Sequence, residues 1–149
     1  MGKIDSEIKS NFISDKHRFV TNLVYTANWV QNAFNEELKP FGISAQQYNI
    51  LRILRGIGDW APMSEIKDGL TEKSPNTTRL ADKLLSKGFV ERKASETDRR
   101  VVYLKITKVG LALFERINQK DSLVQHALNH NISDDEARRV SDILDQFRR

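Results

Sequence analysis

Residues 64–107 read SEIKDGLTEKSPNTTRLADKLLSKGFVERKASETDRRVVYLKIT. The start of this stretch predicts a short helix over 62–70, followed by a turn. A second helix is expected to begin at Ser74, a favoured N-cap, with Pro75 at its first position. Gly88 stands where this second helix should stop. Two short helices joined by a turn are therefore expected at the centre of the chain.

The second half of the stretch predicts a β-hairpin. Short strands are expected over 89–93 and 101–106, and apolar residues alternate along the second of them. The residues between them, 94–99, are polar and charged and form the expected tip. Helix, turn, helix and hairpin in this order are typical of a winged helix-turn-helix, which lays its second helix in the DNA major groove. The expected fold class is therefore mainly α with a small β-hairpin wing.

Helical patterns flank this module on both sides. Apolar residues recur at helical spacing over 15–38, and a further helix opens with a capping box at Ser44. Another helix is expected over 108–128, and a last one opens with a second capping box at Ser133. Both ends of the chain are therefore expected to be helical.

We expect residues 1–149 to form a single domain with two regions. Residues 44–107 form the winged helix-turn-helix lobe, and 15–38 with 108–149 form a helical region. The apolar stripes of the flanking helices exceed what the small lobe can cover, and a second copy of the chain would cover them. The sequence therefore predicts a homodimer held by the flanking helices.

The positive charge of the chain is concentrated in the central module. Residues 73–108 hold ten Lys or Arg against four Asp or Glu, a net charge of +6, whereas the whole chain carries +4. A positive patch confined to one module is the electrostatic footprint of a phosphate binder. Double-stranded DNA is therefore the expected partner.

The second helix of the module is expected to present short polar side chains to the outside. A helical wheel assigns to its buried side Thr77, Leu80, Ala81 and Leu84. Short polar groups reach base edges and phosphates, and an arginine can form two hydrogen bonds with guanine. The candidate DNA contacts on this helix are Ser74, Asn76, Thr77, Thr78, Arg79 and Lys83. The same residues also suit a well-capped helix start without a ligand, and that interpretation stays open.

The hairpin tip supplies three more candidate DNA contacts, Asp98, Arg99 and Arg100. Arginines on a protruding tip suit the narrow, electronegative minor groove. Asp98 can hold an arginine in position by a charge-assisted hydrogen bond. The alternative is a solvated turn, which is the usual meaning of a charged loop.

The sequence resembles the MarR family of bacterial transcriptional regulators. Ser64–Leu70 resembles the family's helix before the turn. Thr77–Arg92 resembles its recognition helix and first wing strand. Asp98–Gly110 resembles its D-x-R wing motif and its L-T-x-x-G junction with the next helix. The flanking helices match the family in number and placement, so the resemblance spans nearly the whole chain.

The resemblance implies a homodimer that binds a pseudo-palindromic operator and represses transcription until a ligand releases it. It implies that the recognition helices enter successive major grooves, with Arg100 in the minor groove and Asp98 as its partner. It also implies that 15–38 and 108–149 form the dimer. The turn at Thr71–Lys73 departs from the family, which often has a glycine and then an apolar residue there.

The resemblance further implies an effector, because many relatives release DNA when a small aromatic or anionic ligand enters a cleft beside the DNA-binding lobe. Aromatic walls with a cation suit such a ligand. The candidate ligand contacts are His17, Arg18, Tyr25, Trp29, Tyr48 and Trp60. Each of them is also explained as an ordinary core or surface side chain, and the ligand is not identified.

Other kinds of site are not expected. The chain has no cysteine, which excludes disulfides, thiolate metal sites and thiol-based sensing. His126 and His130 share a helix face and could bind a divalent metal together with His17 or a carboxylate, but two histidines without a defined third ligand are a weak signal. No metal or cofactor is therefore expected, and a metal at His126 and His130 stays an open alternative. Catalytic motifs are missing, so we expect no enzyme. No apolar run is long enough to cross a membrane and no signal sequence is evident, so the cytoplasm is expected.

A winged helix can also serve as a protein–protein interaction module without sequence-specific DNA binding. The concentrated positive charge argues against this use, because the cores of protein interfaces are depleted in charge. A sequence-specific DNA-binding regulator is therefore the expected function, and the interaction module is the alternative.

Overall fold

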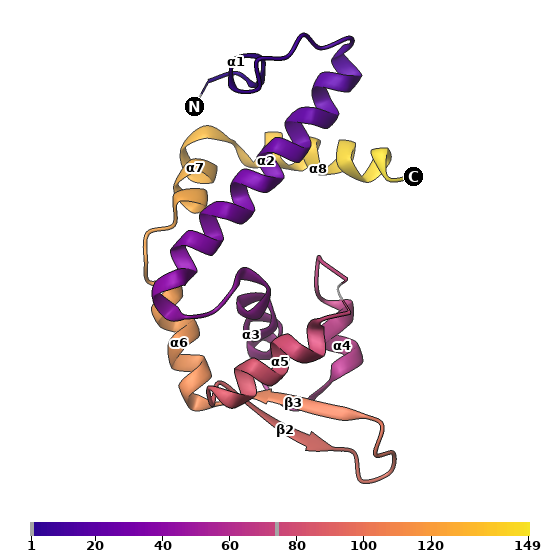
Figure 1. The fold of residues 1–149 in the computed structure, drawn as a ribbon, viewed down its shortest axis with the longest axis vertical. Helices are drawn as coiled ribbons and strands as arrows, with labels where there is room; N and C mark the ends of the chain where they lie inside the picture. The colour runs from indigo at the N-terminus through magenta and orange to yellow at the C-terminus, as the bar shows by residue number, and fades with distance from the viewer. Residues whose placement is uncertain (1, 74) are drawn as a thin grey trace. The chain divides into compact units, whose positions relative to one another are not determined.

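The computed structural model describes residues 2–73 and 75–149. The chain divides into two compact units (Figure 1). One contains the residues up to Glu36 together with Leu123–Arg149, and the other is Glu37–Ser122. The second unit extends beyond the lobe expected over 44–107, because the helix that follows the wing packs against the helix that opens at Ser44.

The elements of the unit Glu37–Ser122 follow the expected order, with one addition. They are the 3-10 helix η1 (Lys39–Phe41), α3 (Ala45–Ile57), β1 (Ala61–Pro62), α4 (Met63–Asp68), α5 (Thr77–Ser86), β2 (Val90–Ala94), β3 (Val102–Ile106) and α6 (Lys108–Asn118). Figure 1 shows α5 beside the hairpin formed by β2 and β3. A mainly helical fold with a β-hairpin wing is confirmed.

The addition is β1, which the sequence did not predict. Among the described residues, three strands form one antiparallel sheet in the order β1-β3-β2, and Ala61 pairs with Leu104. The helix expected over 62–70 is shorter at both ends, Met63–Asp68. A two-residue strand carries no periodic pattern, because only the pairing with β3 makes it a strand.

The core of this unit lies between the helices and the sheet. Its largest fully buried aliphatic side chains are Ile50, Leu51 and Leu54 from α3, Ile66 from α4, Leu84 from α5, and Val90 and Leu104 from the sheet. Burying each such side chain contributes about 1.5–3 kcal/mol. The capping box at Ser44 is confirmed, since the Ser44 hydroxyl accepts from the Gln47 N–H and the Gln47 side chain accepts from the Ser44 N–H.

The start of α5 differs from the sequence prediction. The helix begins at Thr77, so the N-cap position is Asn76 rather than Ser74, and Pro75 precedes the helix. Asn76 has φ −85° and ψ 3°, a turn conformation, and its side chain makes no capping hydrogen bond. Residues 75 and 76 therefore form a turn that delays the helix. Ser74 lies outside the described residues.

The junction between α5, the wing and α6 is tightly packed. Gly88 follows α5 with φ +76°, a conformation that favours glycine. The Thr107 hydroxyl donates to the Gly88 carbonyl at 2.6 Å and accepts from the Gly110 N–H at 3.0 Å. The Thr107 N–H donates to the Phe89 carbonyl at 3.1 Å. A Cβ on Gly110 would lie 2.1 Å from the Phe89 carbonyl oxygen, so only glycine fits there.

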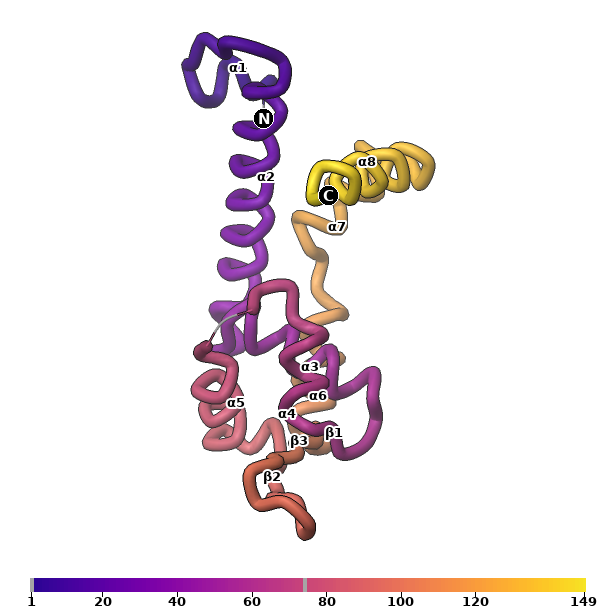
Figure 2. The backbone as a smooth tube through the Cα atoms, turned by 90° about the vertical axis from the view of Figure 1, so that its right-hand side faces the viewer, coloured from indigo at the N-terminus to yellow at the C-terminus, as the bar shows by residue number. Residues whose placement is uncertain are grey.

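The other unit is entirely helical within its described residues. It contains α1 (Ile4–Glu7), most of α2 (Asp15–Leu38), α7 (Leu123–Asn131) and α8 (Asp134–Phe147), and Figure 2 shows α2 as one unbroken helix. The bounds of α2 and the capping box at Ser133 are confirmed. No helix in the described parts of the chain is long and apolar enough to span a membrane.

The prediction of a single helix over 108–128 is wrong. The structure has two helices, because α6 ends at Asn118 and α7 begins at Leu123. The segment between them, Gln119–Ser122, contains no apolar residue. One more helical turn there would bury nothing, so the hydrophobic effect does not favour continuing the helix.

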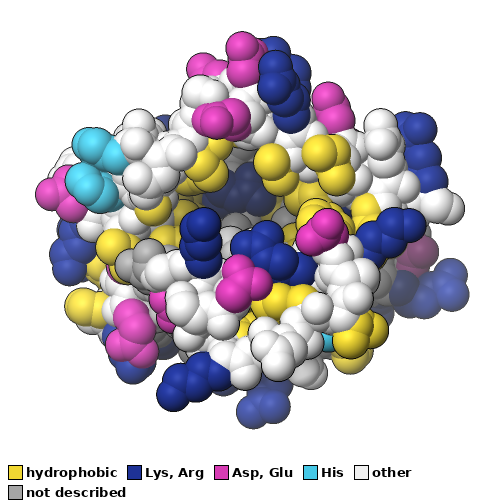
Figure 3. Space-filling view, turned by 90° about the horizontal axis from the view of Figure 1, so that it is seen from above, with side chains coloured by type: hydrophobic (Ala, Val, Ile, Leu, Met, Phe, Trp, Pro, Cys, Tyr) yellow, Lys and Arg dark blue, Asp and Glu magenta, His cyan; other side chains and the backbone are white. Residues whose placement is uncertain are grey.

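This helical unit leaves apolar side chains in solvent. On α8, Val140, Ile143 and Phe147 are each more than half exposed, and so is Val24 on α2. The face drawn in Figure 3 shows hydrophobic side chains at the surface among charged ones. Exposed apolar stripes of this kind mark surfaces that another molecule covers.

Candidate nucleic-acid interface

The helix α5 has one buried face and one polar, exposed face. Ala81 and Leu84 are buried as expected, and Leu80 packs against the core. The predicted contacts Asn76, Thr78, Arg79 and Lys83 are all exposed. The prediction that Thr77 contacts DNA is wrong for its side chain, which is 1% exposed, because it lies on the face that packs into the lobe.

A contact from α3 helps to position α5. It comes from Gln47, for which the sequence predicted only a role in the capping box. Gln47 is buried on α3, and besides completing its capping box it donates from Nε2 to the Leu80 carbonyl at 3.4 Å. The turn before α5 is also tied to α3, since Gln46 donates to Glu72. These contacts join residues far apart in sequence, so no local pattern announces them.

The wing tip is ordered by its own side chains. The Asp98 carboxylate accepts from the backbone N–H of Arg100 at 3.0 Å and from its guanidinium Nε at 3.3 Å. The Ser95 hydroxyl accepts from the N–H of Thr97 and of Asp98, both at 3.3 Å. The Arg100 side chain is nevertheless 92% exposed. The prediction that Asp98 holds an arginine is confirmed, and that arginine is Arg100.

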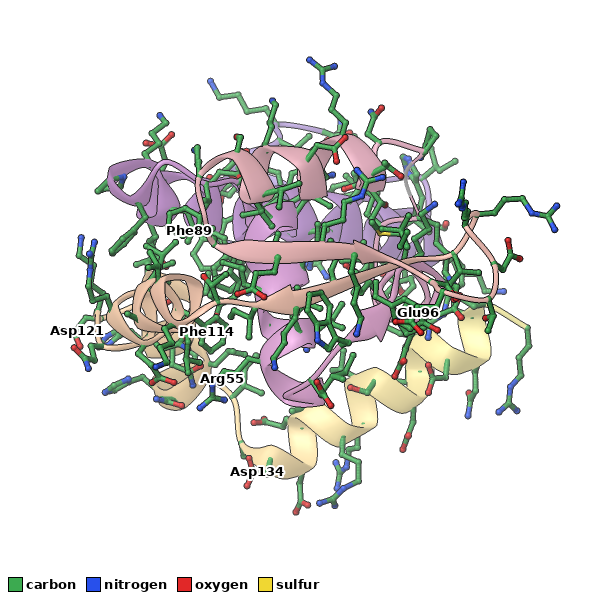
Figure 4. The ribbon with its side chains drawn as sticks, turned by 90° about the horizontal axis from the view of Figure 1, so that it is seen from below. Arg55, Phe89, Glu96, Phe114, Asp121 and Asp134 are labelled. Carbon is green, nitrogen blue, oxygen red and sulfur yellow. The ribbon has the colours of Figure 1, made fainter. Side chains whose placement is uncertain are left out.

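Figure 4 shows where these groups lie in the unit. The wing extends outward at Glu96, while Phe89 marks the other end of the hairpin. Arg99 is exposed beside Arg100. Two cations on a protruding loop match the narrow minor groove, whose negative potential attracts guanidinium groups.

A surface ion pair joins the wing to α5, and sequence reasoning missed it. Arg92 on β2 donates from Nη1 to Asp82 on α5 at 3.3 Å. Both side chains are about half exposed, so the pair contributes little to stability. Its effect is geometric, because it links the two elements that would meet DNA. The available signal was an isolated carboxylate, Asp82, on an otherwise basic helix face.

The aromatic ligand candidates of this unit lie apart from each other. Trp60 precedes β1 at one end of α3, where the Lys93 ammonium lies 4.4 Å from its ring centre. Tyr48 lies at the other end of α3, stacked on Phe114 at 5.2 Å and donating to Asn118 at 2.7 Å. Burial raises the pKa of Tyr48. Trp60 therefore packs beside the wing sheet, at the opposite end of α3 from Tyr48.

Next to Tyr48, a cation caps the aromatic stack. Arg55 lies 5.2 Å from the centre of the Phe114 ring, and its Nε donates to Glu115 at 3.1 Å (Figure 4). These contacts join α3 to α6 and explain why α6 belongs to this unit.

The remaining ligand candidates lie on α2. Arg18 makes two-pronged hydrogen bonds with the Asp5 carboxylate at 3.0–3.2 Å, which lower the pKa of Asp5. Tyr25 donates to Glu7 at 3.2 Å. Trp29 lines the same hollow as Tyr25. The remaining candidate, His17, packs edge-on against Phe12 with ring centres 5.7 Å apart. Arg18 is thus already paired with a carboxylate.

The two C-terminal histidines stack on each other. The ring centres of His126 and His130 are 4.0 Å apart, and Figure 3 shows two histidines side by side in cyan. His130 Nδ1 lies 2.9 Å from the His126 carbonyl oxygen. Among the described residues, no group of three or more His, Cys, Asp or Glu side chains could hold a metal ion.

Comparison with known proteins identifies close relatives. The MarR family profile matches residues 43–102. The multiple antibiotic resistance protein MarR of Salmonella typhimurium is 32% identical over 124 residues, which cover 82% of this chain and 85% of that protein.

Solved structures agree with this fold. A mutant MarR from E. coli complexed with operator DNA superposes with a TM-score of 0.74 and 28% identity, covering 92% of this chain and 99% of that one. CouR from Rhodococcus jostii, solved with p-coumaroyl-CoA, also superposes with a TM-score of 0.74, covering 91% of this chain and 95% of that one. CouR is only 18% identical, so this match shows the fold alone.

Proposed function

The chain belongs to the MarR family, and from this premise we propose that it represses transcription by binding a pseudo-palindromic operator as a homodimer in the cytoplasm. One observation carries the proposal: an exposed polar helix face and a wing-tip arginine held by Asp98 lie within one stretch of net charge +6. The E. coli relative solved with operator DNA supports the same partner.

In the proposed complex, α5 enters the major groove and the wing follows the adjacent minor groove. Arg79 is suited to guanine, and Asn76, Thr78 and Lys83 to other base edges and to phosphates. Arg100, aligned by Asp98, enters the minor groove with Arg99 beside it. Two copies related by a two-fold axis would meet two half-sites about one helical turn apart.

The alternative, a protein-interaction module, is less well supported. Apart from Asp82 and Glu96, the residues exposed on α5 and at the wing tip are cationic or small, whereas interface cores are depleted in charge. Several relatives are named transcriptional regulators or repressors, and nothing in the described site suggests a reaction. We therefore propose no catalytic activity.

Binding to the DNA upstream of its own gene tests the proposed function. We expect tight binding, measured by fluorescence anisotropy, that survives a random duplex competitor. Affinity should fall about a thousandfold or more between roughly 50 and 200 mM salt, because bound counterions are released from each contacted phosphate. Binding that ignores salt, or that random DNA removes equally well, would contradict sequence-specific recognition.

The homodimer is tested on the exposed stripe of α8. Ile143→Asp puts a charge among side chains that are half exposed in the single chain, so we expect monomers at micromolar concentration in sedimentation velocity. Removing residues 133–149 should have the same effect. Asp142→Ala, on the opposite face of α8, should leave the dimer intact. A stable Ile143→Asp dimer would mean that other helices hold the two copies together.

A further inference from the structure

The N-terminal helix α1 is fastened onto α2. Ile4 is only 5% exposed, so the short helix is anchored by an apolar side chain. Asp5 is bound by the Arg18 guanidinium at 3.0–3.2 Å. Glu7 accepts from the Gly2 N–H at 2.7 Å and from the Tyr25 hydroxyl at 3.2 Å. A four-residue helix has little intrinsic stability, so these contacts fix its position.

A hollow lies where α1 meets α2. Its described lining residues are Gly2, Ile4, Glu7, Asn22, Tyr25, Thr26 and Trp29, and its volume is about 90 Å³. This volume is well below that of pockets that enclose a whole drug-sized ligand. The hollow can take an ammonium group, and an apolar body attached to that group would lie at the open mouth.

The charge of the hollow is set by Glu7. Hydrogen bonds from Gly2 and from Tyr25 lower the pKa of Glu7, so the carboxylate is ionised at neutral pH. No Lys or Arg side chain is among the described residues that line the hollow. Arg18 is the cation on α2 nearest in sequence to the lining residues of the hollow, and it forms an ion pair with Asp5. Among the described lining residues, an anionic ligand would therefore meet the Glu7 carboxylate and no Lys or Arg side chain.

The rest of the lining suits the opposite charge. Tyr25 and Trp29 offer aromatic faces, which attract ammonium groups through the ring quadrupole. Each carboxylate oxygen has two lone pairs, so Glu7 can accept further hydrogen bonds beyond those from Gly2 and Tyr25. Asn22 and Thr26 add neutral polar groups at the wall. The combination of one carboxylate with two aromatic walls recognises a cation attached to an apolar body.

We propose that the hollow between α1 and α2 binds a small organic ammonium compound, with Glu7 as its counter-ion and Tyr25 and Trp29 as its walls. This ligand class is opposite in charge to the anionic aromatic effector expected from sequence, because that expectation relied on Arg18. Binding would add contacts to both helices and so hold α1 more firmly in place. The proposal goes beyond DNA binding and does not depend on it.

Tryptophan fluorescence tests the proposal without DNA. The chain has two tryptophans, so in a Trp60→Phe background the signal reports Trp29. The probes are phenethylammonium, its uncharged isostere 2-phenylethanol, and the anion phenylacetate. We expect saturable binding of the ammonium at least tenfold tighter than of the alcohol, and no saturation by phenylacetate. Equal affinity for the ammonium and the alcohol would overturn the proposal.

Three variants separate charge recognition from the fastening of α1. Glu7→Gln should abolish the preference for the ammonium over the alcohol, whereas Glu65→Gln, a matched change at an exposed position of α4, should not. Ile4→Ala loosens α1 without changing any charge, so it should weaken binding of the ammonium and of the alcohol by the same factor. A tenfold charge preference that persists in Glu7→Gln would refute the assigned counter-ion. Because no DNA is present, failure here leaves the proposed repressor function standing, and the reverse also holds.

Discussion

Arg100→Ala is expected to weaken operator binding by about 1–3 kcal/mol while leaving the fold intact. The side chain is 92% exposed and supports no core contact, so its removal should cost no stability. Its loss removes a cation that Asp98 aligns through two hydrogen bonds. Anisotropy titration of operator DNA measures the change, and thermal unfolding checks the fold.

Two further variants give the Arg100→Ala result its meaning. Arg138→Ala breaks a comparable exposed arginine–aspartate pair on α8, 2.9 Å from Asp135, and should leave affinity unchanged. Asp98→Asn keeps the Arg100 charge but weakens its alignment, so it should cost less than Arg100→Ala. If Arg100→Ala and Arg138→Ala bind operator equally well, the wing takes no part in recognition.

Gly110→Ala is expected to destabilise the lobe by about 3 kcal/mol. The added Cβ would lie 2.1 Å from the Phe89 carbonyl oxygen and 2.9 Å from its carbonyl carbon, and backbone cannot move aside as a flexible side chain can. A shift of the Phe89 carbonyl would also disrupt the hydrogen bond that it accepts from the Thr107 N–H. Urea unfolding at a fixed protein concentration measures the loss.

Gly56→Ala is the matched control for this prediction. Gly56 lies within α3, and a Cβ there meets nothing within 4 Å. Alanine is the better helix former, so Gly56→Ala should stabilise the protein by about 0.5–1 kcal/mol. Two glycine-to-alanine changes in helices should therefore have opposite signs. A tolerated Gly110→Ala would show that α6 does not press on the hairpin as described.

The features that the sequence predicted well are those settled within a few residues. Both capping boxes, at Ser44 and Ser133, depend on hydrogen bonds between residues three apart, so the local pattern contains all the information. The buried face of α5 followed in the same way from helical spacing. The clamp of Asp98 on Arg100 spans two residues, and it too could be anticipated.

The features that the sequence did not predict depend on distant partners. The strand β1 exists because Ala61 pairs with Leu104, and Arg92 has its role because β2 brings it to Asp82. The pairing of Arg18 with Asp5 depends on a short helix that has no periodic signal of its own. That pairing is the reason why we propose a cationic rather than an anionic ligand, so a non-local contact altered a functional prediction.

The close packing at Thr107 and Gly110 couples α6 to α5 and to the wing, the two elements proposed to contact DNA. Hydrogen bonds from Thr107 reach both Gly88, at the end of α5, and Phe89, at the root of the wing. We therefore expect a displacement of α6 to move the end of α5 and the start of the wing together. In a dimer, such a displacement would change the distance between the DNA-binding lobes of the two copies rather than the structure of either lobe. DNA binding would then be regulated by the distance between the two lobes, which must match the spacing of the two half-sites on DNA. Each lobe would keep its own sequence preference.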